Sequence, residues 1–414
     1  MTNTSTNKRE LRVLCVHKHI TGPLDLMYEY RQFISGLLDN VDAQTPLRIF
    51  ATDCRFLYIP SFDGEAIQYE RVSSLPRALV HGFDVAHILA PLPPFAQALT
   101  AVILRLRGIP VLLSPNFYLG DDFATSSWFK ERSKLFSKIR PALLRLSQRI
   151  WRLIGSGFMC ASTWEMQQAH LPPERCTLLP WAEPDTPLAN SVRQDNLEPA
   201  EGHQQGPVAY IGRFSVWHKG IDRMCAWLWE HKDSLPRPAL VLFALDRPSS
   251  DQVRITPVWD SREQWPPTLE ALLSEGLIEW DKTTVGAAMI PRLRTCRAVI
   301  LLSRWDGFPR VLREAALMGL PTISTPSCHF ADAVEFLRKG AIVGGDDTDE
   351  LQAAFEEAGN APGDTERAKS LFDRATVGKF LGDLYLAVAR RAPVEDGNYY
   401  RHVEHRYQAA RSGS

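Results

Sequence analysis

The sequence lacks several features that define whole classes of protein. None of its apolar runs approaches the roughly 18 residues that a membrane-spanning helix needs. Residues 1–12 are polar and charged, without the apolar stretch of a secretory signal, so we expect no signal peptide. The seven cysteines are scattered and include no C-x-x-C pair, which argues against a disulfide framework or a zinc ribbon. Together these absences predict a cytoplasmic protein.

An excess of charge is also missing from the chain as a whole. The 47 Lys and Arg against 48 Asp and Glu give a formal net charge of −1, which argues against a nucleic-acid partner. The balance is uneven along the chain, because residues 1–182 hold 20 basic and 15 acidic side chains, a net of +5. Residues 183–414 hold the remaining 27 and 33, a net of −6. A length of 414 residues with 45% hydrophobic content predicts two or three globular domains.

Short apolar runs alternate with longer amphipathic stretches along most of the chain. In the first half we expect helices at 28–38 and 95–106, and strands at 11–16, 47–51, 83–89 and 109–113. In the second half we expect strands at 208–211, 239–244, 277–280, 298–302 and 322–324. Strand, helix and strand at this spacing predict βαβ units and parallel sheets. The predicted fold class is therefore α/β, with two similar domains that face each other.

A change in composition separates the two halves. Residues 183–207 gather Pro and Gly among Asn, Gln and Glu, which indicates a linker. We predict a first domain over 1–185, a linker over 186–207 and a second domain over 208–375. Residues 376–414 are predicted to form helices that pack back on the first domain. Because ligands of parallel α/β domains bind at the carboxyl ends of the strands, the cleft between the domains is the expected site.

The residues after the predicted strand 298–302 indicate a helix with a specific beginning and end. Asp306-Gly307 signals a turn, and Pro309 suits the first helical position because its missing N–H would be unpaired there anyway. Gly319 suits the position just past the last turn. We therefore predict a helix over about 309–318.

The amino end of this helix is a candidate anion site. The backbone N–H groups of Phe308, Arg310 and Val311 would point into the cleft and suit a phosphate. Asp306 lies before the helix and Glu314 about one and a half turns inside it, at about 1.5 Å of rise per residue. One carboxylate could therefore lie on each side of a bound phosphate, where a sugar and a ribose would fit.

A second strand-to-helix turn carries two cations. Residues 210–222 read Tyr-Ile-Gly-Arg-Phe-Ser-Val-Trp-His-Lys-Gly-Ile-Asp. Arg213 offers a planar set of hydrogen-bond donors, and Lys219 offers a point charge. Two cations that converge on one anion in a water-poor cleft would stabilise a leaving diphosphate.

The two turns resemble motifs of the family 4 retaining glycosyltransferases, which have the GT-B fold of two Rossmann-like domains. That family has G-R and K-G after the first strand of its second domain, then E-x7-E within a stretch like S-x-x-E-G-F-P-x-x-x-x-E-A. Gly212-Arg213, Lys219-Gly220 and the residues from Gly307 to Glu314 match in place, whereas Asp306 replaces the first Glu. Residues 162–180 and 83–87 also resemble segments of the family, and the resemblance covers most of residues 80–390.

The resemblance implies that the protein transfers a hexose from a nucleotide-diphosphate sugar, with retention at the anomeric carbon and without a metal or another cofactor. Arg213 and Lys219 would neutralise the diphosphate, Glu314 would bond the donor ribose, and Asp306 would hold sugar hydroxyls. The departing phosphate would take the acceptor's proton. The remaining residues expected to line the donor are Gly212, Gly307, Phe308, Pro309, Val311 and Trp280.

The first domain would supply the acceptor side through His17, Gly22 and Asn116. The family often has Gly-Gly where this chain has residues 17–23, and often His where Asn116 stands. Plain loop or turn residues are the alternative at these positions. At Trp280, contact with the nucleotide base and a structural role both stay open.

Simpler interpretations exist for the main motifs. Arg213 and Lys219 could be surface charges on a turn, Asp306 a helix cap, and Glu314 a solvated helix residue. The sequence Asp347-Thr348-Asp349 has the D-x-D pattern of metal-binding glycosyltransferases of another fold. It stands just before a predicted helix over 351–358, so we interpret it as a cap.

Residues 128–152 form a basic stretch with large apolar side chains between the charges. The stretch holds eight Lys and Arg against one Glu, and its apolar residues recur at helical spacing. A basic amphipathic helix with Trp and Phe suits an anionic membrane surface. The alternative is an ordinary domain helix with its apolar face in the core.

The leading functional hypothesis is a glycosyltransferase that builds a glycan on a lipid-linked or similar acceptor, in surface polysaccharide or glycolipid biosynthesis. The inner face of the membrane is then an alternative location to the open cytoplasm. A hydrolase, epimerase or phosphorylase of sugar nucleotides with the same fold is a second hypothesis. A non-catalytic nucleotide-sugar sensor or scaffold is a third, and Arg213, Lys219 and Glu314 argue against it.

Overall fold

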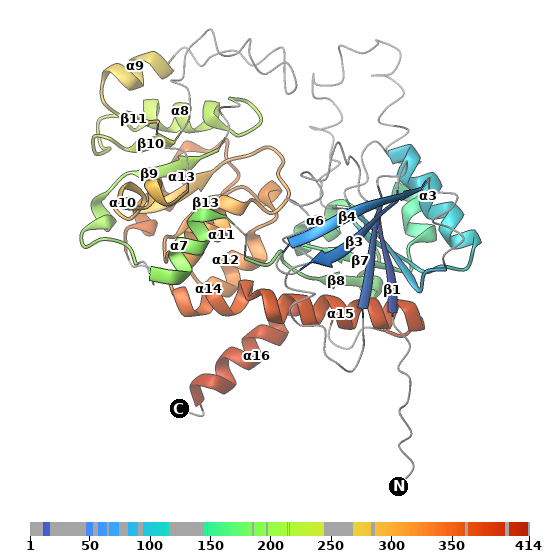
Figure 1. Ribbon diagram of the computed structural model, residues 1–414. Helices are drawn as coiled ribbons and strands as arrows, with labels where there is room; N and C mark the ends of the chain where they lie inside the picture. Colours follow the sequence, from blue (N-terminus) through green and yellow to red (C-terminus); the bar gives the residue numbers. More distant parts are fainter. Residues whose placement is uncertain are drawn as a thin grey trace.

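The protein, in this computed structural model, has two α/β domains, each built on its own sheet (Figure 1). We call the domain that contains β1 the first and the domain that contains β9 the second. No helix of the described residues is long and apolar enough to cross a membrane. The structure describes residues 11–16, 47–52, 57–63, 66–73, 82–89, 94–115, 142, 145–146, 148–183, 186–195, 198–212, 214, 216–243, 268–282, 286–360, 363–393 and 397–412.

The first sheet has the strand order β4-β3-β2-β1-β5-β6-β7-β8. Its strands are β1 Leu11–Val16, β2 Leu47–Thr52, β3 Leu57–Asp63, β4 Ala66–Ser73, β5 Val85–Leu89, β6 Val111–Ser114, β7 Gly157–Cys160 and β8 Cys176–Leu178. The four predicted strands are confirmed within two residues at each end. The strands β3 and β4 were not predicted, and they pair antiparallel, so the sheet is mixed rather than wholly parallel. Its helices include α3 Pro94–Leu106 and α6 Thr163–Gln168.

The second sheet is parallel throughout, with the strand order β11-β10-β9-β12-β13-β14. Its strands are β9 Val208–Ile211, β10 Leu240–Phe243, β11 Ile278–Asp281, β12 Ala298–Leu301, β13 Thr322–Ser324 and β14 Ala341–Ile342. Its helices are α8 Ile221–Glu230, α9 Leu269–Ser274, α10 Ile290–Leu293, α11 Arg310–Leu317, α12 Ala331–Leu337, α13 Thr348–Ala358 and α14 Thr365–Phe372. Because β9 and β12 are neighbours, the turns that follow them lie at the same edge of the sheet.

The chain passes between the two domains twice, and the two passages are hydrogen-bonded to each other. On the way out, the predicted linker contains a helix, α7 Pro187–Asp195, whose Leu188 and Val192 are buried. On the way back, the chain enters α15 Arg374–Arg390. The amide of Glu183 donates to the carbonyl of Phe372 at 2.8 Å, and the Arg374 guanidinium donates to the carbonyl of Glu183 at 3.2 Å.

The helix α15 runs beneath both domains in Figure 1 and packs on β5 and β6. A buried hydrogen-bond chain fixes it there, because the Tyr385 hydroxyl lies 2.8 Å from Nδ1 of His87, and Nε2 of His87 lies 2.7 Å from the Ser114 hydroxyl. The last helix, α16 Tyr399–Ser412, also contacts the first domain, where the Tyr400 hydroxyl donates to the carbonyl of Ala161 at 3.0 Å.

His87 should make the stability of the protein depend on pH. Burial lowers the pKa of His87 from 6.5 to about 3, so the folded state keeps this imidazole neutral while the unfolded chain takes up a proton. The contribution of neutral His87 to the free energy of unfolding is therefore intact above pH 6.5. As the pH falls from 6.5 toward 3, the free energy of unfolding decreases by about 1.4 kcal/mol per pH unit. We expect His87→Gln to remove this part of the slope when unfolding by denaturant is measured from pH 7 to pH 5. His405→Gln, at an exposed position on α16, is the control and should keep it.

Candidate active site

Lys219 and Asp306 meet where the turns after β9 and β12 lie side by side. The Lys219 ammonium donates to Oδ2 of Asp306, and both side chains are largely buried, with 14% and 19% of their surface exposed. The residues are 87 positions apart in the sequence. The sequence prediction placed both in one site, and the structure brings them into direct contact.

Neighbouring side chains hold the two turns together. The ring of Trp305 stacks on that of His218 with 4.5 Å between centroids, and Nε2 of His218 lies 2.8 Å from the Trp305 carbonyl oxygen. The Arg304 guanidinium makes two hydrogen bonds to the Asp222 carboxylate, at 2.9 and 2.7 Å. A paired, fork-like contact of this kind fixes orientation as well as distance. Residues next to Lys219 and next to Asp306 in the sequence therefore bind each other, and they hold the two turns in place around the ion pair.

Gly220 allows the turn after β9 to approach β12 closely. Its φ of +71° lies in the left-handed region that favours glycine. A Cβ atom at this position would lie 2.1 Å from the carbonyl oxygen of Leu302. A side chain here would therefore push the turn, and Lys219 with it, away from β12.

Asp306 is held in its ionised form. Burial alone would raise the pKa of this carboxyl, but the charge and hydrogen bond of Lys219, with help from His218 and the Gly307 amide, lower it overall. The Gly307 amide donates to Oδ1 at 3.0 Å, and the amide of Asp306 itself donates to the carbonyl of Ser327 at 3.0 Å. An ionised carboxylate accepts hydrogen bonds and does not donate them, which suits the binding of hydroxyl groups.

The helix after β12 lies within one residue of its predicted bounds at each end, because Pro309 caps it and is not its first residue. Pro309 precedes the first residue of α11 as its cap, Met318 follows the last, and Gly319 then turns the chain with φ +72°. Phe308, just before the helix, also has a left-handed φ of +51° although it is not glycine. A conformation of this kind costs about 1–3 kcal/mol and needs support from its surroundings.

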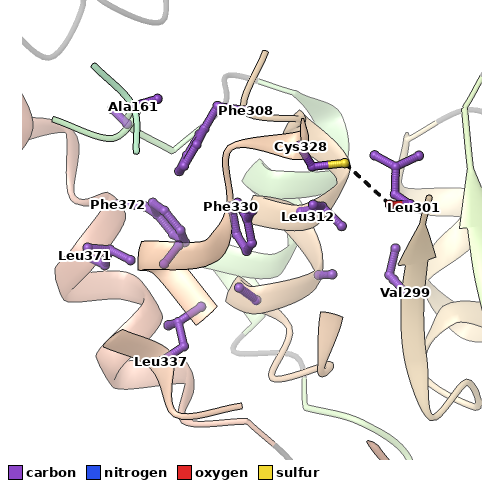
Figure 2. Packing of buried hydrophobic residues seen from close by; sticks show 14 of the residues in the cluster. Ala161, Val299, Leu301, Phe308, Leu312, Cys328, Phe330, Leu337, Leu371 and Phe372 are labelled. Carbon is purple, nitrogen blue, oxygen red and sulfur yellow. Dashed lines mark hydrogen bonds between the residues drawn. The ribbon is translucent and has the colours of Figure 1, made fainter. Parts of the chain in front are cut away.

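Packing of the Phe308 ring provides that support (Figure 2). The ring is buried against Phe330, at 5.1 Å between centroids, and against Phe372, at 6.3 Å. Figure 2 shows Ala161 of the first domain at the edge of the same cluster. The side chain of Phe308 thus anchors the start of α11 in the core, so a donor could meet only the backbone of this residue.

Glu314 is buried rather than solvated. Its Oε1 accepts a hydrogen bond from the Thr186 hydroxyl at 2.5 Å. Burial raises the pKa of Glu314, although Thr186, Arg310 and Arg313 act in the opposite direction. The simpler interpretation of Glu314 as a solvated helix residue is therefore wrong.

Residues that follow β7 in the first domain contact residues of the second domain that follow β13. The backbone and hydroxyl of Thr163 both donate to the Asp332 carboxylate, at 2.8 and 2.5 Å. Glu165 lies with Oε2 3.6 Å from Nδ1 of His329, and both side chains are almost fully buried. These contacts place the start of α6 next to the residues that follow β13.

Comparison with known families gives one match, and it includes both turns. Residues 207–359 match the family model described as "Glycosyl transferases group 1". The matched segment spans 153 of the 414 residues. Comparison with curated protein sequences gives no match.

Solved glycosyltransferase structures share the two-domain fold of the whole chain. A sucrose-phosphate synthase from Thermosynechococcus elongatus superposes with a TM-score of 0.56 and 16% identity, over 92% of this chain and 100% of that one. An α,α-trehalose-phosphate synthase (UDP-forming) from Burkholderia vietnamiensis gives 0.55 and 12%, over 92% and 100%. A lipopolysaccharide outer core galactosyltransferase, WaaB, gives 0.55 and 11%, over 91% and 99%. The predicted resemblance to GT-B glycosyltransferases and the predicted α/β fold are confirmed.

Several predicted site residues take no part in the described geometry. Arg213, His17, Gly22 and Asn116 lie outside the described residues, as does most of 128–152. Gly212 directly follows β9, and Val311 lies in the first turn of α11. Trp280 is half-buried near the end of β11, two strands from β9. Its role stays a prediction.

Sequence reasoning missed some residues that support the candidate site. Thr186, which binds Glu314, lies in the predicted linker, where nothing in the local pattern indicates a contact with α11. Ser327, whose carbonyl accepts from Asp306, comes from the turn after β13. Asp347 accepts hydrogen bonds from the amides of Asp349 and Glu350, which confirms the prediction of a helix cap. The described residues contain no cluster of three or more His, Cys, Asp or Glu that could hold a metal ion.

Proposed function

We propose that the protein is a retaining glycosyltransferase that moves a hexose from a nucleotide-diphosphate sugar to a glycan or lipid-linked acceptor. The observation that best supports this proposal is the contact between Lys219 and Asp306, which follow the ends of two neighbouring strands. Both residues lie inside the segment that matches the family model described as "Glycosyl transferases group 1". A cation next to an ionised carboxylate can bind both the nucleotide-diphosphate part and the sugar part of such a donor. The ammonium suits the diphosphate, and the carboxylate suits sugar hydroxyls.

In this proposal the second domain binds the donor. Lys219, with Arg213, neutralises the charge that develops on the leaving diphosphate, so no metal ion is needed for that task. The amide group of Phe308 faces the donor at the start of α11, while the Gly307 amide holds the Asp306 carboxylate beside it. Glu314 accepts from the ribose hydroxyls, and the Thr186 hydroxyl holds its carboxylate in place. Asp306 is one methylene shorter than the Glu typical of the family, which would change its reach toward the sugar.

The acceptor is proposed to bind to the first domain. His17, Gly22 and Asn116 of the first domain are proposed to meet the acceptor. One structure with the same fold is, by its name, a lipopolysaccharide outer core galactosyltransferase, which supports a glycan or glycolipid acceptor. Another is UDP-forming by its name, which makes a UDP-sugar the first donor to test. We propose a cytoplasmic protein that works at the inner face of the membrane.

A screen of thermal stability against nucleotide sugars tests donor binding. We expect one of the UDP-, GDP-, ADP- or dTDP-sugars to raise the melting temperature, because a ligand at 100 times its Kd stabilises a protein by about 2.7 kcal/mol. The free monosaccharide is the control and should give no rise. Absence of a shift with every nucleotide sugar would contradict the proposal. Rapid turnover of the donor without any acceptor would point instead to a hydrolase of the same fold.

A further inference from the structure

Thr186 of the predicted linker connects the helix α7 to the candidate active site. Its hydroxyl accepts a hydrogen bond from the Ala189 amide at 3.1 Å, and its carbonyl accepts one from the Asn190 amide at 2.9 Å. These are the bonds of a residue that caps the amino end of a helix. The same hydroxyl donates to Oε1 of Glu314 at 2.5 Å, and both residues are buried. Thr186 therefore contacts both the linker helix and α11.

The hydrogen-bond chain from Ala189 through Thr186 to Glu314 has a fixed direction. A backbone amide can only donate, so the Thr186 oxygen accepts from Ala189 and its single proton points to Oε1 of Glu314. The oxygen that accepts this proton carries none of its own. Amide groups at the amino end of a helix also carry partial positive charge, and the chain begins at such an end. The linker helix therefore favours the ionised form of Glu314.

Burial of Glu314 acts against this ionised form. Burial is the largest influence on the pKa of Glu314 and raises it, whereas the Thr186 bond and the charges of Arg310 and Arg313 act to lower it. Both arginines belong to α11, and Arg313 is itself tied to the linker because its guanidinium donates to the Ala182 carbonyl. Of the three groups that support the carboxylate, Thr186 alone lies outside α11. Without its hydroxyl, Glu314 would take up a proton more readily.

We propose that Thr186 is a positioning residue for the donor, which engages Oε1 of Glu314 so that Oε2 accepts hydrogen bonds from the ribose hydroxyls. The proposal rests on the proposed function, in which Glu314 binds the ribose, and it makes the linker between the domains a part of the donor site. The alternative is that Thr186 only caps α7. In that case its bond to Glu314 stabilises the fold and has no specific effect on ribose binding.

Binding of nucleotides with and without ribose hydroxyls tests this proposal. We titrate UDP, GDP, ADP and dTDP into the full-length protein by calorimetry at pH 7, each beside its 2′,3′-dideoxy analogue. The wild type should bind one of the four about 10-fold more tightly than its analogue, the effect typical of one hydrogen bond to a charged group. Thr186→Val should lose about 10-fold in affinity for that nucleotide and bind the dideoxy analogue as the wild type does. Thr186→Ser keeps the hydroxyl and should match the wild type with both.

The pH dependence of nucleotide binding gives a second readout. Glu314 accepts hydrogen bonds from a ribose only above its pKa, so affinity should fall as the pH is lowered through that value. Loss of the Thr186 bond should raise the pKa of Glu314 further, so the affinity of Thr186→Val should begin to fall at a higher pH. The phosphates of the nucleotide titrate alike with every variant. A difference between variants from pH 8 to pH 5 therefore belongs to the protein.

Thr348→Val is the matched control, because the Thr348 hydroxyl also donates to a carboxylate, that of Glu230 at 2.6 Å, outside the candidate site. It should bind every nucleotide as the wild type does. Thr186→Asp keeps an oxygen that can cap α7 but has no proton for Glu314, and it replaces Thr186→Val if that variant does not fold. Equal losses for the nucleotide and its dideoxy analogue would overturn the proposal and leave Thr186 as a helix cap. Failure of the wild type to bind any of the four nucleotides would contradict the proposed function itself, and this proposal with it.

Discussion

Replacing Lys219 by alanine should reduce the rate of sugar transfer by about 10²–10³-fold, because a fixed cation that faces developing negative charge stabilises the transition state by this amount in other enzymes. Arg213→Ala is expected to act similarly. The rate with saturating donor and acceptor, measured by release of the nucleoside diphosphate, checks both. An unchanged rate in both variants would defeat the proposed mechanism.

A second variant separates chemistry from folding. Removal of Lys219 leaves the Asp306 carboxylate without its cation, and a buried polar group without a partner costs about 1–3 kcal/mol, or more if it is charged. The double variant Lys219→Ala with Asp306→Asn removes that charge and should recover the melting temperature. Its transfer rate should stay low. Recovery of the rate together with the stability would mean that Lys219 serves only to keep Asp306 in place.

Replacing Gly220 by alanine should impair both stability and transfer. The new Cβ atom would lie 2.1 Å from the Leu302 carbonyl oxygen, and the backbone would keep an unfavourable left-handed φ. Overpacking costs about 1–3 kcal/mol, and the left-handed conformation adds about 1–2 kcal/mol. Because Lys219 is the preceding residue, the shift needed to relieve the clash would also move its ammonium. Denaturant unfolding and the transfer rate measure the two effects.

Gly276→Ala is a matched control for this substitution. Gly276 has φ +73°, close to the value for Gly220, but a Cβ atom there would meet no atom within 4 Å. It should therefore carry the backbone cost alone and leave the transfer rate unchanged. Equal losses of stability in the two variants would show that a Cβ atom at residue 220 does not clash with the Leu302 carbonyl oxygen.

The parts of the fold that the sequence predicts best are those with strong local signals. The strands β1, β9 and β13 were predicted to the residue, and β1 and β9 are short, mostly apolar runs closed by polar or turn residues. The helix α11 was predicted within one residue at each end from Pro309 and Gly319. The antiparallel strands β3 and β4 have no comparable run, since Ile67 and Tyr69 alternate with polar residues and Pro60 interrupts the other strand.

The sequence predicts which residues form the candidate site, but it does not predict their contacts. Motif spacing predicts that Lys219, Asp306 and Glu314 share one site, but the direct ion pair between the first two depends on which strands are neighbours in the sheet. The strand order is set by packing of the whole domain and has no local signal. The same holds for Thr186, which reaches Glu314 across 128 residues.

The two passages of the chain between the domains have a mechanical consequence. At Glu183 and Phe372 the outgoing and returning backbones are bonded to each other, so both connections cross at one place. The last helix also ties the domains together, because Tyr400 of α16 bonds to Ala161 of the first domain and Glu404 pairs with Arg367 of the second. A rotation of one domain against the other about this crossing would therefore have to shift α16 against one of the two domains and break the bonds between Thr163 and Asp332.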